Sequence, residues 1–352
     1  MADLTWGALL QSLLLDETAD PEQLRWAMRQ TLSGDATPSQ IAAWLVALRA
    51  RNVDAADLNV LLDVMLEHSV AIDVPGVALD TCGTGGDGAH TLNISTMASI
   101  IAAAAGVKVV KHGNRAASSK CGSADVLEAL GIRMDLAPEQ VVRVLDLAGI
   151  TFCFAPTFHP AARFAGPVRR ELGIRTVFNV LGPLANPARV AAQLVGVSDP
   201  EVAPVVAAAL AARGVKALVV RGQDGLDEIS VFAPTDVWST LSGAVETFTI
   251  TPADFGITDV AADALNGFDA EYNAEQLVKL FSGEGAAGLR DAVCLNAAAS
   301  LVAAKAVEQP VVDVKAAMAA AMDQARELVD NGAALATLRK WQDAVATVTS
   351  EK

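Results

Sequence analysis

From Pro75 onward, short β-branched runs alternate with segments that have the composition of helices. Alanine-rich stretches such as 201–213 separate these runs, which lie at 107–110, 150–154, 194–197 and 217–220. This alternation predicts an α/β domain with a largely parallel sheet. Ligands of such sheets gather beyond the carboxyl ends of the strands, so the loops that follow the strands are the first places to search for a site.

A glycine-rich stretch at 80–96 follows a short strand predicted at 77–79 and leads into an apolar helix predicted at 97–105. Its backbone can adopt positive φ and admit a ligand without Cβ interference, because four of six positions are Gly83, Gly85, Gly86 and Gly88. The amides and dipole of the following helix make phosphate a natural guest. The alternative is a plain turn with a helix cap, and the spacing matches neither the Walker loop nor the dinucleotide fingerprint.

A second polar loop, at 111–125, follows the strand predicted at 107–110. It gathers cationic and hydroxyl side chains, namely Lys111, Arg115, Ser118, Ser119, Lys120 and Ser123. A solvated basic loop is the alternative interpretation. Two such loops at adjacent strand ends could together hold a molecule that bears several phosphates.

A third loop carries adjacent carboxylates, Asp227 and Glu228, after the strand predicted at 217–220. Hard oxygen ligands combined with substrate phosphates are the usual way to hold Mg²⁺, so the pair is a candidate metal site. An ordinary polar turn is the alternative.

The segment 160–172 is predicted as a helix that carries Arg163, Arg169 and Arg170, with prolines on either side. An arginine there could grip a carboxylate substrate through its bidentate fork. Pairing with Glu171 or exposure to solvent is the alternative for each of them.

The N-terminal part, to about residue 70, is predicted to be a group of short amphipathic helices. Asp20 caps one of them, with Gln23 completing a capping box; Thr37 and Gln40 repeat that signature, and Asp54 caps another. We expect these helices to pack on the main domain and on a second copy of the chain. Near the other end, 237–250 is predicted as a hairpin, and helices at 289–307 and 314–329 are predicted to cover the sheet.

Composition bounds the class of protein. With 352 residues, 52% apolar and 19% charged, the chain can bury a substantial core, and its net charge of −15 argues against general nucleic-acid binding. The four cysteines lack metal-ligand spacing, and we expect them to be reduced thiols. The sequence shows no signal-peptide pattern and no apolar run of about 20 residues, so we expect a cytoplasmic protein.

Five motifs in order carry a resemblance to a known family: GTGGD at 83–87, KHGNR at 111–115, SAD at 123–125, RRELG at 169–173 and NVLGPL at 179–184. The chain resembles the anthranilate phosphoribosyltransferases. These enzymes transfer the phosphoribosyl group of 5-phosphoribosyl 1-pyrophosphate (PRPP) to the amino group of anthranilate, in tryptophan biosynthesis. Ala116 departs from the serine of many relatives, which puts one hydroxyl contact in doubt.

The resemblance implies a fold, an assembly and a metal. A small helical domain at 1–70, joined by helices from about 158–185, would accompany a larger α/β domain at 75–155 and 188–352. The larger domain would have a central, mostly parallel sheet, similar to the pyrimidine nucleoside phosphorylase type of phosphoribosyltransferase. Homodimers would form through the helical domain, and each subunit would hold Mg²⁺ as two ions.

The resemblance also implies the site residues, with none as a classical acid or base. PRPP would contact Gly83, Gly86, Asp87, Thr91, Asn93, Ile94, Ser95, Thr96, Lys111, His112, Gly113, Asn114, Arg115, Ala116, Ala117, Ser118, Ser119 and Ser123. Anthranilate would contact Gly83, Asn114 and Arg169, with Arg170 as second choice for its carboxylate, and Mg²⁺ would be bound by Ser95, Asp227 and Glu228. Two rivals are a pyrimidine nucleoside phosphorylase-like enzyme and a catalytically silent relative that binds nucleic acid.

Overall fold

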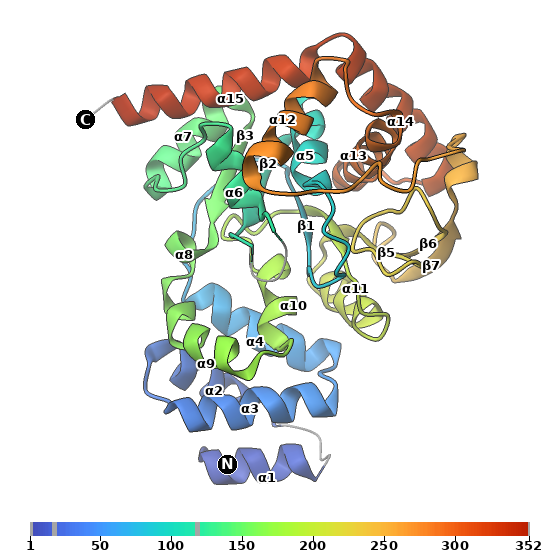
Figure 1. Ribbon diagram of the computed structural model, residues 1–352. Helices are drawn as coiled ribbons and strands as arrows, with labels where there is room; N and C mark the ends of the chain where they lie inside the picture. Colours follow the sequence, from blue (N-terminus) through green and yellow to red (C-terminus); the bar gives the residue numbers. More distant parts are fainter. Residues whose placement is uncertain (1–2, 16–19, 117–119, 351–352) are drawn as a thin grey trace. The chain divides into compact units, whose positions relative to one another are not determined.

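The computed structural model describes residues 3–15, 20–116 and 120–350 (Figure 1). The chain divides into two compact units. The first, which we call the helical unit, comprises residues 1–71 and 155–187, and the second, the sheet unit, comprises residues 72–154 and 188–352. The predicted residues Ala117, Ser118 and Ser119 lie outside the described part of the chain.

A seven-stranded sheet in the order β3-β2-β1-β4-β5-β6-β7 forms the centre of the sheet unit (Figure 1). The strands are β1 Ala78–Gly83, β2 Lys108–Gly113, β3 Ile150–Phe154, β4 Ala192–Gly196, β5 Lys216–Gly222, β6 Thr235–Ser239 and β7 Glu246–Ile250. The first five pair in parallel, and β6 and β7 extend the sheet as an antiparallel hairpin. The predicted mostly parallel sheet and the predicted hairpin are both confirmed.

Two strands run further than predicted, into the polar motifs. The parallel ladder pairs Gly83 of β1 with Gly196 of β4, and Gly113 of β2 with Phe154 of β3. The sequence pattern predicts strands that end at Leu79 and Val110. Pairing continues through 80–82 and 111–112 to the glycine at each strand end, so the first residues of each motif are fixed by the sheet.

Helices cover the sheet and one another. Those of the sheet unit are α5 Ile94–Ala104, α6 Ser123–Ala129, α7 Pro138–Ala148, α11 Val202–Ala212, η2 Pro252–Phe255, α12 Ala270–Phe281, α13 Ala287–Glu308, α14 Val314–Asp330 and α15 Ala333–Ser350. Of the two helices predicted to cover the sheet, α13 packs on β1, β4 and β5, whereas α14 packs mainly on α13. In the described part of the chain, α13 alone is long and apolar enough to span a membrane, and 78% of its apolar window is buried.

The helical unit is built from short capped helices: α1 Trp6–Leu14, α2 Pro21–Ser33, α3 Pro38–Arg51, α4 Ala55–Glu67, α8 Ala155–Phe158, η1 Pro160–Phe164, α9 Gly166–Leu172 and α10 Val177–Leu184. Asp20, Thr37 and Asp54 accept first-turn amides as predicted, each worth about 1 kcal/mol. Gln23 differs from expectation, because its amide donates to the Asp3 carbonyl at 2.9 Å instead of closing a capping box.

The single helix predicted at 160–172 is two elements. A 3₁₀ turn, η1, ends at Phe164, and α9 starts again at Gly166. Pro167 explains the break, since it has no N–H to donate to the carbonyl four residues earlier. Arg163 therefore lies on the 3₁₀ turn, while Arg169 and Arg170 lie on α9.

Candidate functional site

The candidate site lies in the sheet unit, where the loops after β1, β2, β4 and β5 come together. The Gly85 N–H donates to Oδ2 of Asp227 at 2.6 Å, which joins the first loop to the last. The Lys111 ammonium donates to Oγ of Ser95 at 3.1 Å, and Ser198 donates to the Gly85 carbonyl at 3.0 Å. The polar loops that the sequence analysis singled out thus converge at one edge of the sheet.

The glycines of the first loop serve two separate purposes. Gly85, Gly86 and Gly88 have φ of +64°, +79° and +71°, which side chains with a Cβ rarely adopt. Gly83 has an ordinary φ but no room, because a Cβ there would collide with the Asp227 carboxylate. Its neighbour Gly196 is tighter still, since a Cβ would meet the Asp227 backbone carbonyl. The close approach of the acidic loop therefore requires glycine at position 196, and at position 83 a side chain would displace the Asp227 carboxylate.

The N-terminus of α5 faces the acidic pair. Asn93 is the N-cap residue, and within the described residues its side chain makes no capping hydrogen bond. The Ser95 backbone N–H instead binds the Glu228 carboxylate. The other two first-turn amides also have partners, because Ile94 donates to the Leu92 carbonyl at 2.7 Å and Thr96 to the Asn93 carbonyl at 3.1 Å. The positive end of the dipole of this eleven-residue helix still favours negative charge nearby.

Asp227 and Glu228 are half-buried and adjacent, so the ionised forms of the two carboxylates repel each other. Burial raises the pKa of Glu228 to about 8, and the Asp227 charge adds to that rise, while Lys111 and the Ser95 N–H oppose it. Two adjacent carboxylates with a nearby hydroxyl are a donor set that suits Mg²⁺. No group of three or more His, Cys, Asp or Glu side chains that could hold a metal exists in residues 3–15, 20–116 and 120–350. A cation here would need waters or substrate oxygens to complete its coordination.

Lys111 reaches this region from the interior. Its side chain is only 2% exposed, and its ammonium donates to the Thr81 carbonyl at 2.5 Å as well as to Ser95. Burial lowers its pKa, and the Asp80 carboxylate acts in the opposite sense. Lys111 thus orients the Ser95 hydroxyl from the buried side through this hydrogen bond.

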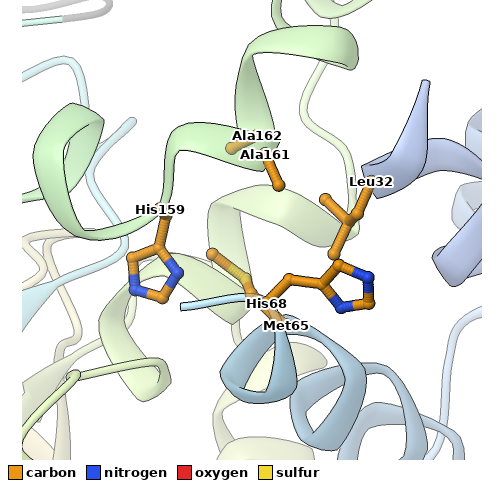
Figure 2. A pocket seen from close by; sticks show the side chains of 6 residues that line it. All are labelled: Leu32, Met65, His68, His159, Ala161 and Ala162. Atoms are coloured by element: carbon orange, nitrogen blue, oxygen red, sulfur yellow. The ribbon is translucent and has the colours of Figure 1, made fainter. Parts of the chain in front are cut away.

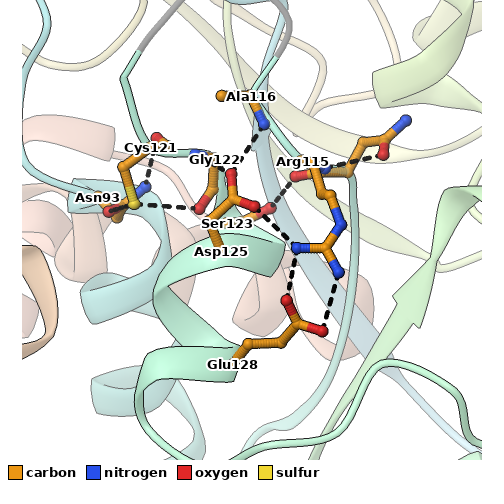
Figure 3. A network of polar contacts seen from close by, with 9 residues as sticks. Asn93, Arg115, Ala116, Cys121, Gly122, Ser123, Asp125 and Glu128 are labelled. Carbon is orange, nitrogen blue, oxygen red and sulfur yellow. Dashed lines mark hydrogen bonds and ion pairs between the residues drawn. The ribbon is translucent and has the colours of Figure 1, made fainter. Parts of the chain in front are cut away.

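The β2–α6 loop is tied together at its base by Asp125 (Figure 3). One carboxylate oxygen accepts the N–H groups of Ala116 at 3.0 Å and Gly122 at 2.8 Å. Burial alone would raise the pKa of Asp125, but these two hydrogen bonds and the Arg115 guanidinium lower it. Arg115 also pairs with Glu128 at 2.9 Å, so its charge is shared with two carboxylates. Asp125 belongs to the SAD motif at 123–125, and no local pattern in the sequence indicates its role.

The remaining residues that were predicted to contact PRPP differ in burial and in their hydrogen-bond partners. His112 donates its N–H to Asp80 at 3.2 Å and is buried, whereas Asn114 is exposed and accepts the Arg115 N–H. Ser123 donates to the Asn114 carbonyl at 3.3 Å. In the first loop, Asp87 accepts the Ala89 N–H, Thr91 pairs with Asn266, and Ile94 and Thr96 are buried.

Arg169 belongs to the helical unit. Its guanidinium stacks 5.3 Å from the centre of the Phe178 ring, and burial lowers its pKa. Arg170 on the same helix is exposed. Of the two, Arg169 is the more buried.

A narrow hollow in the helical unit is lined by Leu32, Met65, His68, His159, Ala161 and Ala162 (Figure 2). It has no room for a water molecule. The His159 ring donates its Nε2–H to the Ala185 carbonyl at 2.7 Å, and the His68 ring contacts the Val64 carbonyl at 2.9 Å. Both histidines are therefore structural, and this hollow carries no chemistry.

A second residue that the sequence analysis missed supports the acidic loop. Asn296 of α13 is fully buried and forms two hydrogen bonds with the backbone of Ile229. Its side-chain oxygen accepts the Ile229 N–H at 3.0 Å, and its Nδ2–H donates to the Ile229 carbonyl at 3.2 Å. This clamp fixes the backbone next to Glu228. An asparagine in the middle of an apolar helix is the signal that could have found it, because a buried amide must have partners.

The chain is similar to known proteins over most of its length. The glycosyl transferase family a/b domain matches residues 75–335, and the helical bundle domain of that family matches residues 8–69. An anthranilate phosphoribosyltransferase of Thermobifida fusca is 48% identical over 341 residues, covering 97% of each chain.

Solved structures are similar over nearly the whole chain. The anthranilate phosphoribosyltransferase of Thermus thermophilus has a TM-score of 0.88 at 37% identity, covering 96% of this chain and 99% of that one. The corresponding enzyme of Saccharomyces cerevisiae, in complex with PRPP and Mg, has a TM-score of 0.87 at 30% identity, covering 98% and 99%.

Proposed function

The chain belongs to the anthranilate phosphoribosyltransferase family, and we propose that the loops after β1, β2 and β5 form its PRPP and Mg²⁺ site. The reaction transfers the 5-phosphoribosyl group of PRPP to the amino group of anthranilate and releases N-(5-phosphoribosyl)anthranilate and pyrophosphate. It is a step of tryptophan biosynthesis. The observation that carries the site assignment is the hydrogen bond from Gly85 to Asp227, because it brings the phosphate-binding backbone against the acidic pair.

Each part of the site has a distinct task in this proposal. The amides of the first loop would bind phosphate oxygens of PRPP, and the positive end of the α5 dipole would favour their charge. The residues of the β2–α6 loop would hold the remaining phosphate and the ribose. Asp227, Glu228 and Ser95 would bind Mg²⁺, which the family uses, and we propose two ions per subunit. Bound Mg²⁺ would neutralise charge on the leaving pyrophosphate.

The chemistry requires no strong base. As the bond from ribose C1 to pyrophosphate breaks, the ribose gains oxocarbenium character and the leaving group gains negative charge, which the aligned amides stabilise. The amine of anthranilate attacks C1, and its proton then passes to water. Orientation is the other large contribution. We propose that Gly83, Asn114 and Arg169 orient anthranilate, with the Arg169 fork on its carboxylate.

Assembly and location are further proposals. We propose a homodimer formed through the helical unit and a cytoplasmic location. Both rival functions, nucleoside phosphorolysis and silent binding of nucleic acid, are disfavoured because relatives that match almost the full chain are anthranilate phosphoribosyltransferases.

The test follows anthranilate fluorescence with purified protein, PRPP and Mg²⁺, with EDTA as one control and the double variant Asp227→Asn/Glu228→Gln as another. A loss of fluorescence that needs both PRPP and Mg²⁺ and disappears in the variant would support the reaction and the metal site. Folded protein that binds PRPP but leaves anthranilate unchanged would refute the transfer, and phosphate-dependent cleavage of a pyrimidine nucleoside would then be assayed.

A further inference from the structure

A short segment before α12 pairs with the end of the glycine-rich loop. Residues 265–268, which we call the strap, lead into α12 (Figure 1). Leu92 donates its N–H to the Leu265 carbonyl, and Gly267 donates its N–H to the His90 carbonyl, both at 2.8 Å. The strap is none of the seven strands of the sheet, so these two bonds form a separate connection between two loops.

Thr91 lies at the centre of this pairing. It forms an antiparallel bridge with Asn266, between the bonds that the strap makes to the neighbours of Thr91 on either side. Thr91 is half-buried, whereas the loop before it is exposed at positions 85, 86 and 88–90. An exposed backbone rich in glycine has little conformational preference of its own. The strap therefore sets the position of the Thr91 backbone and the direction of its side chain.

His90 has a backbone conformation that needs support from its surroundings. Its φ is +51°, in the left-handed region, which is unfavourable for a residue with a Cβ. Such a conformation persists where neighbouring contacts hold it. The hydrogen bond from Gly267 to the His90 carbonyl is such a contact, and it fixes the chain directly before Thr91.

Gly267 fits this pairing because it has no side chain. A Cβ there would lie 2.6 Å from the Thr91 carbonyl oxygen and 2.8 Å from the Leu92 nitrogen. Both are backbone atoms, which cannot rotate aside as the end of a side chain can. Any other residue at position 267 would therefore push the strap and the loop apart.

The strap itself is held from two sides. Leu265 is 2% exposed and anchors its first residue in the core. At the other end, the Phe268 N–H donates to Oδ1 of Asn273 at 2.9 Å, and Asn273 of α12 is 1% exposed. When the two segments are forced apart, the exposed loop is therefore the one that yields.

We propose that the strap is a positioning element for PRPP: its pairing with the loop directs the Thr91 hydroxyl toward a phosphate oxygen of PRPP, and this pairing requires glycine at position 267. The role rests on the proposed function. Gly267 touches no substrate and acts only through Thr91.

Gly267→Ala should weaken PRPP binding. The added methyl group displaces the Thr91 backbone, so the hydroxyl loses its contact with the phosphate. Loss of one hydrogen bond to a charged oxygen corresponds to a rise of at least about tenfold in the Kd of PRPP, which calorimetry measures. The KM of anthranilate at saturating PRPP should stay within about twofold.

Gly285→Ala is the matched control. A Cβ at Gly285 would lie 2.7 Å from Cα of Leu280, which is also a backbone atom, near the far end of α12. This variant should lose stability in urea titrations as Gly267→Ala does, but its PRPP Kd should stay within about twofold of wild type. An equal rise in Kd would assign the effect to general destabilisation and overturn the proposal.

A double-mutant cycle tests whether the strap acts through Thr91. Thr91→Val keeps the branched shape of the side chain and removes the hydroxyl. In that background, adding Gly267→Ala should change the PRPP Kd by less than about twofold. A further rise as large as in the wild-type background would refute the role of Thr91.

The wild-type protein provides the test if Gly267→Ala does not fold. By linkage, PRPP must stabilise the pairing as much as the pairing favours PRPP. Hydrogen exchange of the Gly267 amide should therefore slow with PRPP by about tenfold more than that of Ser282, an amide at the far end of α12. Equal slowing of the two amides would overturn the proposal.

The same measurements separate this role from the proposed site. Wild type that binds PRPP, together with an unchanged Kd in Gly267→Ala, refutes the role of the strap alone. Wild type that binds no PRPP refutes the proposed site and the role of the strap together.

Discussion

The backbone N–H of Gly85 donates a 2.6 Å hydrogen bond to Oδ2 of Asp227, a residue 142 positions further along the chain. One carboxylate oxygen of Asp227 is thereby fixed against the glycine-rich loop. A charged acceptor in such a bond is worth roughly 1.5–3 kcal/mol. The relationship makes the acidic loop and the glycine-rich loop parts of one site.

Asp227→Asn should weaken metal binding while the fold persists. The amide can still accept the Gly85 N–H, but it removes a negative charge from the proposed Mg²⁺ ligands. We expect the Mg²⁺ concentration for half-maximal activity to rise at least about tenfold. Without Mg²⁺ the melting temperature should change little, because relief of the repulsion between Asp227 and Glu228 offsets the weaker hydrogen bond from the Gly85 N–H. Glu246→Gln, on the exposed β7 strand, is the control, and a matching shift there would argue against a specific metal role.

Gly196→Ala should destabilise the sheet unit. The added Cβ would collide with the Asp227 backbone carbonyl, which cannot move aside as a side chain would, so we expect a loss of about 1–3 kcal/mol in the free energy of unfolding. Gly7→Ala on α1 is the matched control, since a Cβ there meets nothing within 4 Å and the change should be neutral or stabilising. Urea titrations of both variants make the comparison; equal stabilities would contradict the tight approach.

Asp125→Ala should release the base of the β2–α6 loop. It leaves the Ala116 and Gly122 N–H groups without their carboxylate acceptor, so we expect the PRPP Kd to rise about tenfold. Glu128→Gln tests the same arginine without touching the loop backbone, because the Glu128 carboxylate binds only the Arg115 side chain in the described hydrogen bonds. Calorimetry of PRPP binding should therefore show a large effect in the first variant and a small one in the second. The reverse order would assign the role to Arg115 instead.

Acidification should destabilise the helical unit through His159. Burial lowers the pKa of this histidine below its usual 6.5, so the unfolded chain binds more protons than the folded one as the pH falls below that value. Stability should be constant above pH 6.5 and fall below it, by at most about 1.4 kcal/mol per pH unit from this group. His159→Gln keeps a neutral donor for the Ala185 carbonyl, and urea titrations from pH 5 to 8 should show a shallower acid slope. An unchanged slope would mean that other groups dominate.

Local sequence patterns were enough to place most elements. The alternation of β-branched runs with helices located the parallel strands, and Thr37 with Gln40 located a capping box that the structure contains. The polar loops were predicted to meet because the carboxyl ends of parallel strands share one edge. Two features that were not predicted, the break at 165 and the C-terminal helix α15, also have local signals in the sequence. Pro167 marks the break between η1 and α9, and α15 repeats apolar residues such as Leu338, Trp341 and Val345 at helical spacing.

The remaining features depend on contacts between distant residues, which a local pattern does not encode. Asn273 lies 180 positions from Asn93, and Asn296 lies 67 positions from Ile229. Both are buried asparagines whose partners are fixed by how α12 and α13 pack. The same holds for Gly196, whose lack of a side chain is required by a loop that follows a different strand. Periodicity predicts which elements form, and tertiary packing decides which polar groups meet.

Arg169→Ala should affect anthranilate much more than PRPP. The arginine is held over Phe178 and is half-buried, so its planar fork is preorganised for a carboxylate. We expect the KM of anthranilate to rise at least about tenfold and the KM of PRPP to change by less than about twofold, because a charged hydrogen-bond pair is lost from one substrate alone. Arg170→Ala is the matched control on the exposed side of the same helix and should change neither. Steady-state kinetics with each substrate varied in turn measures both constants, and equal increases in the two KM values for Arg169→Ala would refute the carboxylate role.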